Sequence, residues 1–303
     1  MSTVPPGKKI AVRVPASSAN LGPGFDSLGL ALGLYDDLTF EVIDSGIEGS
    51  ISGEGAAHLQ VTGDHLVVAA FRRALHAVGI DLPGVRLTCH NRIPHSRGLG
   101  SSASAAVAGV VAAQALVPHL IDRDLAVHLA GIEEGHPDNS SASILGGAVI
   151  SWCEDDNEPR YKAVRIPTHP GLRATALVPS TRASTSVVRK VLPENIPHVD
   201  ARFNLARSAL LTYALQHDPA LLLEATKDKL HQGYRAEALP VTTEWVARMR
   251  DAGLAAFVSG AGPTALALHT QDFPAELAES ASNAGLRVLS LDIAEGATAQ
   301  LID

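Results

Sequence analysis

The sequence of 303 residues has only two cysteines, Cys89 and Cys153. They lie far apart and form no Cys-x-x-Cys pair, which argues against a disulfide framework and against a zinc site. We expect both to be buried free thiols, because cysteine is among the residues most often buried in proteins. Free thiols suit a protein of the reducing cytosol.

Long apolar segments are also missing. The first residues, MSTVPPGKK, lack the apolar core of a signal peptide. No stretch reaches the roughly 18 unbroken apolar residues that read as a membrane span. The apolar run from Ala103 to Val117 is too short for one, and we expect it to form a buried helix.

The chain has no excess of basic residues either. Its 24 Lys and Arg residues face 32 Asp and Glu residues, which gives a net charge of −8. This acidic balance argues against non-specific binding of nucleic acid. It does not exclude a phosphate ligand, because such a ligand requires only a local positive field.

The length and the 46% hydrophobic content fit one large domain or two ordinary ones. A polar stretch at 154–160, EDDNEPR, interrupts the hydrophobic pattern, so we expect one domain at 1–155 and a second at 156–303. Strands are predicted in the second part at 173–178, 255–258, 265–269 and 287–291, with helices between them. Their order, β-α-β-β-α-β, is that of the ferredoxin-like fold.

Several boundaries follow from capping and turn residues. Asp64 and Asp122 are predicted to cap helices that run to about Val78 and Glu134. The stretch GHPDNSS at 135–141 is predicted to be a loop, and residues 220–231 are predicted to form one helix. The fold class expected from the whole pattern is α+β.

The most informative segment is PHSRGLGSSASAA at 94–106, in which a glycine-rich loop leads into an alanine-rich helix. Backbone N–H groups of such a loop, at a helix N-terminus, can bind a phosphate anion. The lysine of the ordinary P-loop is absent. The candidate ATP-binding residues are Pro94, Arg97, Gly98, Leu99, Gly100, Ser101, Ser102 and Ala103.

A dinucleotide-dependent oxidoreductase is one alternative, because the pattern G-x-G-x-x-A occurs twice, from Gly98 and from Gly260. The first copy follows a loop rather than a strand. The second leads into the strand-like ALALH rather than into a helix. Each copy therefore lacks the context that the dinucleotide fingerprint requires.

Three segments resemble the signature motifs of the GHMP kinases, in their order and spacing. They are VRVPASSANLGPGFDSLGLAL at 12–32, PHSRGLGSSASAA at 94–106 and VSGAGPTALAL at 258–268. The string PASSANLGPGFD is typical of the homoserine kinase branch, and EGHPDN, TSVVRKVLP and LHQGYR support it. The resemblance implies an N-terminal α+β lobe and a ferredoxin-like C-terminal lobe. It also implies transfer of the ATP γ-phosphoryl group to the hydroxyl of L-homoserine.

The resemblance implies a magnesium ion that accompanies ATP, with Glu134 as one ligand. Ser102, the hydroxyl near the helix start, is expected to be the second ligand, and Ser101 is the alternative. Magnesium prefers oxygen ligands and keeps several waters, so two protein ligands are enough beside a phosphate.

The substrate residues also follow from the matching motifs. Arg189 and Arg235 match arginines that bind the substrate carboxylate, for which the guanidinium fork is suited. Asn20 and Asp26 suit the substrate ammonium. The remaining expected contacts are His136 and Asn139 at the reacting hydroxyl, and Gly260 and Gly262 of the third motif.

No catalytic base emerges from the sequence. Asp138 is interpreted as a residue that stabilises its loop, and Asn139, Glu134 and Arg189 are the expected catalytic residues. Direct proton loss to the phosphate, with Asn139 orienting the hydroxyl, fits a loose transition state. The alternatives are a GHMP kinase for another alcohol and a non-catalytic ligand-binding regulator. Members of the family are often homodimers.

Overall fold

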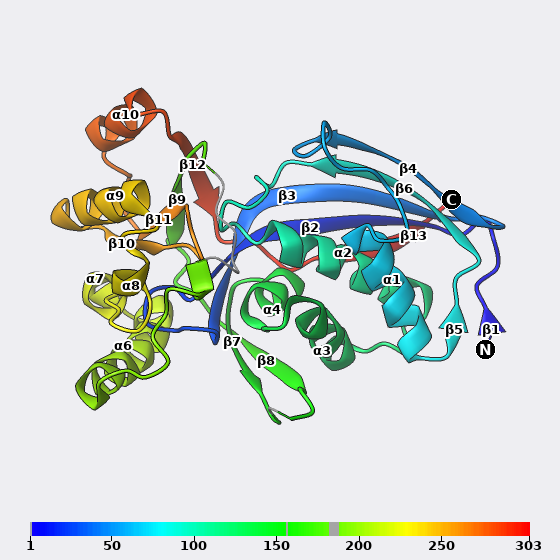
Figure 1. The fold of residues 1–303 in the computed structure, drawn as a ribbon, viewed down its shortest axis with the longest axis horizontal. Coiled ribbons are helices and arrows are strands. Elements are labelled where there is room, and N and C mark those ends of the chain that lie inside the picture. The colour runs from blue at the N-terminus through cyan, green and yellow to red at the C-terminus, as the bar shows by residue number, and fades with distance from the viewer. Residues whose placement is uncertain (1, 156, 182–187) are drawn as a thin grey trace.

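The computed structural model describes residues 2–155, 157–181 and 188–303 and arranges them in two lobes that lie side by side (Figure 1). The N-terminal lobe is built on a sheet with strand order β13-β2-β3-β6-β4, in which β7 also pairs with β3 and β8 with β7. Its strands are β2 (Lys9–Ala19), β3 (Leu28–Val42), β4 (Gly46–Gly53), β6 (Gly84–Asn91), β7 (Ala148–Cys153), β8 (Tyr161–Ile166) and β13 (Thr298–Ile302). A small separate pair joins β1 (Ser2–Thr3) and β5 (Ile80–Asp81).

Helices cover one face of the large sheet (Figure 1). They are α1 (Leu66–Ala77), α2 (Ser101–Leu116), α3 (Arg123–Glu134) and α4 (Asp138–Leu145). Helix α2 is buried from Ala106 to Ala113, as its apolar composition predicts. At Gly109 a Cβ would lie 2.5 Å from the carbonyl oxygen of Val67, so only glycine lets α1 approach this closely. This packing holds the middle of α2 against α1.

In the described part of the chain, no helix combines the length and apolarity needed to cross a membrane. The predicted burial of the cysteines is confirmed for Cys89 and is wrong for Cys153, which is partly exposed.

The C-terminal lobe contains an antiparallel sheet with strand order β10-β11-β9-β12. The strands are β9 (Arg173–Val178), β10 (Ala255–Val258), β11 (Ala265–His269) and β12 (Arg287–Asp292). The predicted ferredoxin-like order is therefore confirmed. The helices are α6 (His198–Gln216), α7 (Leu222–Ala225), α8 (Gln232–Arg235), α9 (Pro240–Asp251) and α10 (Ala275–Asn283), with a 3-10 helix at Pro219–Leu221.

The two lobes share one hydrophobic cluster. Leu21 and Leu30 of the N-terminal lobe belong to the same buried cluster as Leu211 and Phe257 of the C-terminal lobe. The expected boundary at residue 155 lies inside the hairpin of β7 and β8, which pair antiparallel from Ala148 to Ile166. The large sheet therefore extends to Ile166, and β13 returns to it from the end of the chain.

Two local predictions were wrong because tertiary contacts prevail over local composition. Residues 138–145 form helix α4, although their serines are typical of turns. Its residues 140–144 are all buried, so packing decides the conformation. The predicted single helix at 220–231 is broken, because the Asp228 carboxylate accepts the N–H groups of Leu230, His231 and Gln232. Such side-chain bonds compete with helical bonds.

The predicted helix caps had different outcomes. Asp122 caps α3 as predicted, since its carboxylate accepts the N–H of Leu125. Asp64 does not cap α1, because the N-cap residue is His65 and no side-chain cap bond forms there.

The loop at 20–26 lies where the lobes meet, and its backbone is unusual. Asn20, Leu21, Gly22 and Asp26 all have positive φ angles, of 71°, 48°, 87° and 52°. Asparagine, aspartate and glycine tolerate this region, whereas leucine does so only when its surroundings hold it there. A Cβ at Gly22 would collide with the carbonyl oxygen of Thr226 in the C-terminal lobe.

We therefore expect Gly22→Ala to destabilise the protein more than the same substitution at a glycine that has a similar positive φ but no close neighbour. Gly253 is the matched control, because its φ of 82° is similar and no atom of the described residues lies within 4 Å of a Cβ built there. Gly253→Ala should cost about 1–2 kcal/mol from the left-handed backbone alone. Urea unfolding should show a clearly larger loss for Gly22→Ala, and equal losses would contradict the close contact between lobes.

Candidate functional site

A cleft of about 350 Å³ lies between the two lobes. It collects residues from all three sequence motifs and from the EGHPDN segment. The lining residues are Ala19, Asn20, Asp26, Ser96, Gly98, Gly100, Ser101, Ser102, Glu134, His136, Asp138, Asn139, Arg189, Arg235, Gly260, Ala261 and Gly262. Most of the residues expected at the site are thus brought together from distant parts of the chain.

The N-terminus of α2 points its backbone into this cleft. Its N-cap, Gly100, has a φ of 70°, and no side chain caps the helix. The first bond of this turn runs from the N–H of Ser104 to the carbonyl of Gly100. The N–H groups of the three residues before Ser104 have no partner within the helix, as at every helix start. Together with the helix dipole, they form a positive site suited to a phosphate.

Four of the expected ATP-binding residues are not part of the cleft lining. Leu99 and Ala103 are fully buried, and neither they nor Pro94 belong to the described cleft lining. Arg97 lies outside the lining too. Its guanidinium donates to the carbonyl oxygens of His95 at 3.2 Å, Pro179 at 3.0 Å and Ser180 at 2.5 Å. Arg97 therefore fastens the loop to the C-terminal lobe, and a contact of its side chain with phosphate stays a prediction.

Glu134 and Ser102 meet at the edge of the cleft, where the Ser102 hydroxyl donates to the Glu134 carboxylate at 2.7 Å. Burial raises the pKa of Glu134, while the bond from Ser102 opposes that rise. Both groups supply oxygen, the ligand that Mg²⁺ prefers. No group of three or more His, Cys, Asp or Glu that could hold a metal occurs among the described residues. A magnesium ion with two protein ligands and phosphate oxygens fits this arrangement.

His136, Asp138 and Asn139 form a hydrogen-bonded unit on the N-terminal lobe. The Asp138 carboxylate lies 2.7 Å from His136 Nδ1 and accepts the N–H of Asn139 at 2.7 Å. Asp138 thus makes the stabilising contacts expected from the sequence. Burial lowers the pKa of His136, but the bond and charge of Asp138 outweigh it and raise the pKa above its ordinary value.

Sequence reasoning missed the role of Ser17, which lies in the first motif. Its hydroxyl donates to Asn139 Oδ1 at 3.0 Å, so the amide nitrogen of Asn139 is left for the cleft. Ser17 also lies against the loop at 98–102, because a Cβ at Gly100 would collide with its hydroxyl. Its place in PASSAN, three residues before Asn20, could have indicated this role.

The polar residues of the first motif face the C-terminal lobe. Asn20 donates from Nδ2 to the carbonyl of Gly260 at 3.0 Å and accepts the N–H of Asp26 at 3.0 Å. Asp26 forms a two-pronged ion pair with Arg189, with distances of 2.5 and 3.0 Å. The two groups expected to bind opposite ends of the substrate thus pair with each other. Residues 185–187 of the TSVVRKVLP segment lie outside the described residues.

Arg235 is 1% exposed, yet it belongs to the cleft lining. Its Nη1 donates to the carbonyl of Gly260 at 3.1 Å and to His231 Nδ1 at 3.0 Å. Its Nε is buried without a partner from the described residues. Burial, then the charge of Arg189, lowers the pKa of Arg235 to about 10, so it stays charged at neutral pH.

A second cavity of about 410 Å³ adjoins the cleft and shares Ser96, Ser101 and Ser102 with it. Its walls come from β3, β6, α1, α2 and the loops that precede the two helices. They include Leu38, Leu59, Leu66, Val67 and Ala105, with Asp36, His65 and Cys89 as polar neighbours. Burial, then the charge of Asp36, raises the pKa of Cys89 to about 12, so the thiol is neutral. Part of the second motif, from His95 to Ala105, lines this cavity, and the other lining residues lie outside the three motifs.

The structure argues against a dinucleotide-dependent oxidoreductase. The second G-x-G-x-x-A copy leads into strand β11 (Ala265–His269), not into a helix. The first copy opens α2 but follows the loop after Asn91 rather than a strand. Neither copy forms the strand-turn-helix unit that the fingerprint requires.

Comparisons with known proteins match nearly the whole chain. The GHMP kinases N terminal domain matches residues 65–147, and the GHMP kinases C terminal domain matches residues 206–286. A homoserine kinase of Corynebacterium diphtheriae is 54% identical over 302 residues, which cover 98% of each chain. One of Rhodococcus erythropolis is 54% identical over 97% of this chain and 96% of its own. The crystal structure of homoserine kinase from Cytophaga hutchinsonii has a TM-score of 0.83 at 26% identity, covering 97% of both chains.

The Asp138–His136 contact makes a prediction that needs no substrate. Asp138→Asn removes the charge that favours the imidazolium, so burial prevails and the pKa of His136 should fall below its wild-type value. NMR titration of the histidine ring protons measures this shift. Asp122→Asn, which changes a helix cap on the far end of α3, should leave the pKa of His136 unchanged. An unchanged pKa in Asp138→Asn would contradict the contact.

Proposed function

This chain belongs to the homoserine kinase family of the GHMP kinases, and we propose that it transfers the γ-phosphoryl group of ATP to the side-chain hydroxyl of L-homoserine. The product, O-phospho-L-homoserine, is a precursor for threonine synthesis. The observation that most supports this proposal is the cleft between the lobes, in which the N-terminus of α2 faces two arginines and an aspartate. One side suits a polyphosphate, and the other suits a zwitterion.

The phosphates of ATP are proposed to lie at the N-terminus of α2, against the backbone of the Gly98–Ser102 loop. The adjoining apolar cavity is then the place for the base, because it opens onto the same serines. The walls from Leu66, Val67 and Ala105 suit a flat, largely apolar ring. His65 Nδ1 is buried there without a partner among the described residues, so it is available to a polar edge of the base.

Glu134 and Ser102 are proposed to hold the magnesium ion, and Ser101 remains the alternative second ligand. When bound, Mg²⁺ would neutralise charge on the β- and γ-phosphate oxygens. The raised pKa of Glu134 has burial as its first cause, so a nearby positive charge would favour the carboxylate form. The Ser102 hydroxyl already points at that carboxylate.

L-Homoserine is proposed to lie between Asp26, Arg189 and Arg235. Its carboxylate suits the two guanidinium groups, and its ammonium suits the carboxylate of Asp26. The ion pair between Asp26 and Arg189 is about one-third exposed on each side. A zwitterion can insert between these two side chains without a net change of charge. Its carboxylate then pairs with Arg189 in place of Asp26, and its ammonium pairs with Asp26 in place of Arg189. Gly260 and Gly262 line the same part of the cleft.

The hydroxyl of the substrate is proposed to face Asn139 and His136. Because Ser17 donates to Asn139 Oδ1, the Asn139 amide nitrogen can donate to the hydroxyl oxygen or to the phosphate. An amide does not accept a proton at neutral pH, so Asn139 orients the nucleophile and is not a base. The oxygen of homoserine bonds to the γ-phosphorus, the bond to the β-phosphate oxygen breaks, and the hydroxyl proton passes to the phosphoryl group.

The direct test is a steady-state assay of ADP release with a panel of alcohols. Purified protein with ATP and magnesium should turn over L-homoserine with a far higher kcat/KM than L-serine, mevalonate or galactose. A preference for another alcohol would favour a different GHMP kinase. Binding of ATP without any turnover would favour a non-catalytic regulator.

We also propose a cytosolic location and a homodimer. Cys89 and Cys153 are free thiols in the structure, which fits a reducing compartment. Light scattering on the purified protein measures the oligomeric state, and a mass of one chain would contradict the dimer.

Glu134→Gln keeps the shape of the side chain and removes its charge. We expect turnover to fall by roughly a hundredfold or more, because charge stabilisation through the metal would be weakened. The magnesium concentration for half-maximal rate should rise. Glu133→Gln is the control, since its carboxylate pairs with Arg73 and is not among the described residues of the cleft. Wild-type turnover of Glu134→Gln at limiting magnesium would contradict the assignment.

Arg189→Lys keeps the positive charge but loses the two-pronged fork. We expect kcat/KM for L-homoserine to fall, with a loss of transition-state stabilisation of about 1.5–3 kcal/mol, the range for a charged hydrogen bond. Arg189→Ala should lose more, because Asp26 then also lacks its partner. The affinity for ATP should change little.

The comparison that isolates the carboxylate uses 3-aminopropanol, which is homoserine without its carboxylate. For the wild-type protein, kcat/KM should be much higher with homoserine than with 3-aminopropanol. In Arg189→Ala the ratio of the two kcat/KM values should be smaller. An unchanged preference would show that Arg189 does not bind the carboxylate.

A further inference from the structure

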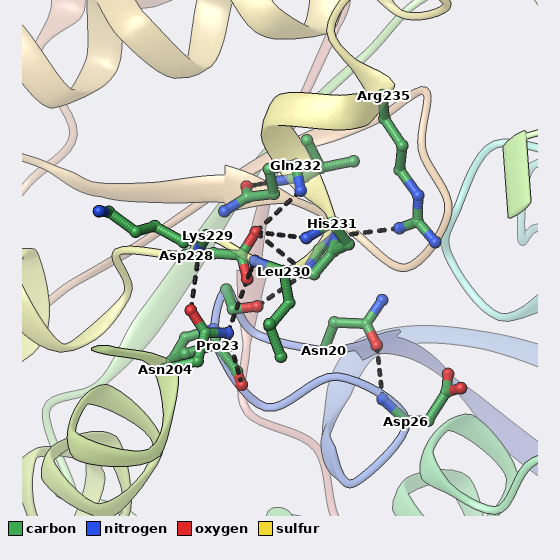
Figure 2. A network of polar contacts seen from close by, with 12 residues as sticks. Asn20, Pro23, Asp26, Asn204, Asp228, Lys229, Leu230, His231, Gln232 and Arg235 are labelled. Carbon is green, nitrogen blue, oxygen red and sulfur yellow. Dashed lines mark hydrogen bonds and ion pairs between the residues drawn. The ribbon is translucent and has the colours of Figure 1, made fainter. Parts of the chain in front are cut away.

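His231 is fully buried beside the cleft, and its two ring nitrogens have different partners. Its Nε2 lies 2.7 Å from the carbonyl oxygen of Gly22, and its Nδ1 lies 3.0 Å from Arg235 Nη1 (Figure 2). A carbonyl oxygen only accepts a hydrogen bond, and a guanidinium only donates. The Nε2 must therefore carry the proton, and the Nδ1 must accept. These partners define a neutral imidazole with one tautomer.

The turn that carries His231 is held by Asp228, whose carboxylate also lies 3.8 Å from His231 Nε2, beyond hydrogen-bond distance. The Asp228 carboxylate accepts the N–H groups of three residues that follow it, as well as the Nδ2 of Asn204 (Figure 2). Asn204 in turn accepts the N–H of Lys229 at 2.8 Å and donates to the carbonyl of Pro23 at 3.3 Å. The same network thus holds the turn and the 20–26 loop, so the position of the imidazole is set before any ligand arrives.

Arg235 depends on this imidazole for its orientation. Its Nη1 is shared between His231 Nδ1 and the carbonyl of Gly260, whereas its buried Nε has no partner among the described residues. A guanidinium held by one nitrogen presents its other edge to the cleft. Because Arg235 lines the cleft, the part of its guanidinium that is not bonded to His231 is suited to a carboxylate there.

We propose that His231 is a positioning residue for the carboxylate of the substrate: its neutral Nδ1 accepts from Arg235 and aims the guanidinium into the cleft. The inference rests on the proposed homoserine kinase activity. It adds a residue that does not touch the substrate and that belongs to none of the expected site residues. His231 connects the first-motif loop, through Gly22, to the arginine that ends the LHQGYR segment.

The surroundings support a neutral ring. Burial lowers the pKa of His231, and the positive charge of Arg235 lowers it further, against the opposing effect of Asp228 and Asp26. The ring of Phe25 lies 5.2 Å from the imidazole, centroid to centroid. Simple packing against Phe25 is the competing role, and the experiment must separate it from the hydrogen bond to Arg235.

Two substitutions divide the functions of the imidazole. His231→Asn places an acceptor oxygen near the position of Nδ1 and loses the donor to Gly22. His231→Gln places an amide donor near the position of Nε2 and loses the acceptor for Arg235. Both variants reduce the packing against Phe25, so a role in packing alone predicts similar defects in both.

We expect His231→Gln to lose roughly tenfold or more in kcat/KM for L-homoserine, the size of one hydrogen bond to a charged group. His231→Asn should stay within about threefold of wild type, since it keeps that bond. With 3-aminopropanol, which has no carboxylate, both variants should match wild type. The KM for ATP should stay unchanged in both.

Other outcomes overturn the proposal. If a variant loses the same factor in kcat/KM with L-homoserine and with 3-aminopropanol, the role of His231 is structural only. If His231→Asn loses more than His231→Gln, the role belongs to the bond with Gly22. No loss in either variant would remove His231 from the account. A wild-type protein inactive toward homoserine would refute the proposed function itself, which is a distinct result.

A measurement on the wild-type protein keeps the test decisive if a variant does not fold. Nitrogen NMR of protein labelled in its histidines reports which ring nitrogen carries the proton. The proposal requires a neutral His231 protonated at Nε2 at pH 7. A proton on Nδ1, or a charged ring, would contradict it.

Discussion

The loop from Asn20 to Asp26 runs between the lobes on a left-handed backbone, and its contacts decide how the site is built. Four of its residues have positive φ angles, including Leu21, which is fully buried in the cluster shared by both lobes. Its carbonyl groups at Gly22 and Pro23 accept from His231 and Asn204, and Asn20 donates to Gly260. The C-terminal lobe thus holds the loop in a conformation that its sequence alone would not favour.

This constraint explains why the two halves of the reaction meet in one cleft. The N-terminal lobe supplies the start of α2 and the Glu134–Asn139 segment, which suit phosphate, metal and hydroxyl. The C-terminal lobe supplies Arg235 and Gly260, next to Asp26 and Arg189, which suit an amino acid. Since little proton-transfer chemistry is demanded of side chains in phosphoryl transfer, the fixed distance between these groups is the main contribution of the fold.

The sequence predicted the parts of the molecule that are encoded locally. The ferredoxin-like order followed from clear strands and turns, and the three motifs identified most of the cleft, because glycines, serines and charged residues occur there at characteristic spacings. The second cavity was missed, since the second motif supplies only part of its lining, and the rest includes scattered apolar residues such as Leu38, Leu59 and Val67, which resemble any core. The role of His231 was missed because its partner Gly22 lies 209 residues away. Helix α4 was missed because burial outweighed the turn preference of its serines.

Phosphorus NMR of a completed reaction tests the central claim most directly, because it shows which oxygen of the amino acid has received the phosphoryl group. With ATP, magnesium and L-homoserine, the account predicts one new phosphomonoester signal that couples to the side-chain methylene protons, together with an equal amount of ADP. Inorganic phosphate alone, an acyl phosphate on the carboxylate or no reaction would contradict a cleft that fixes the zwitterion with its hydroxyl toward the γ-phosphate.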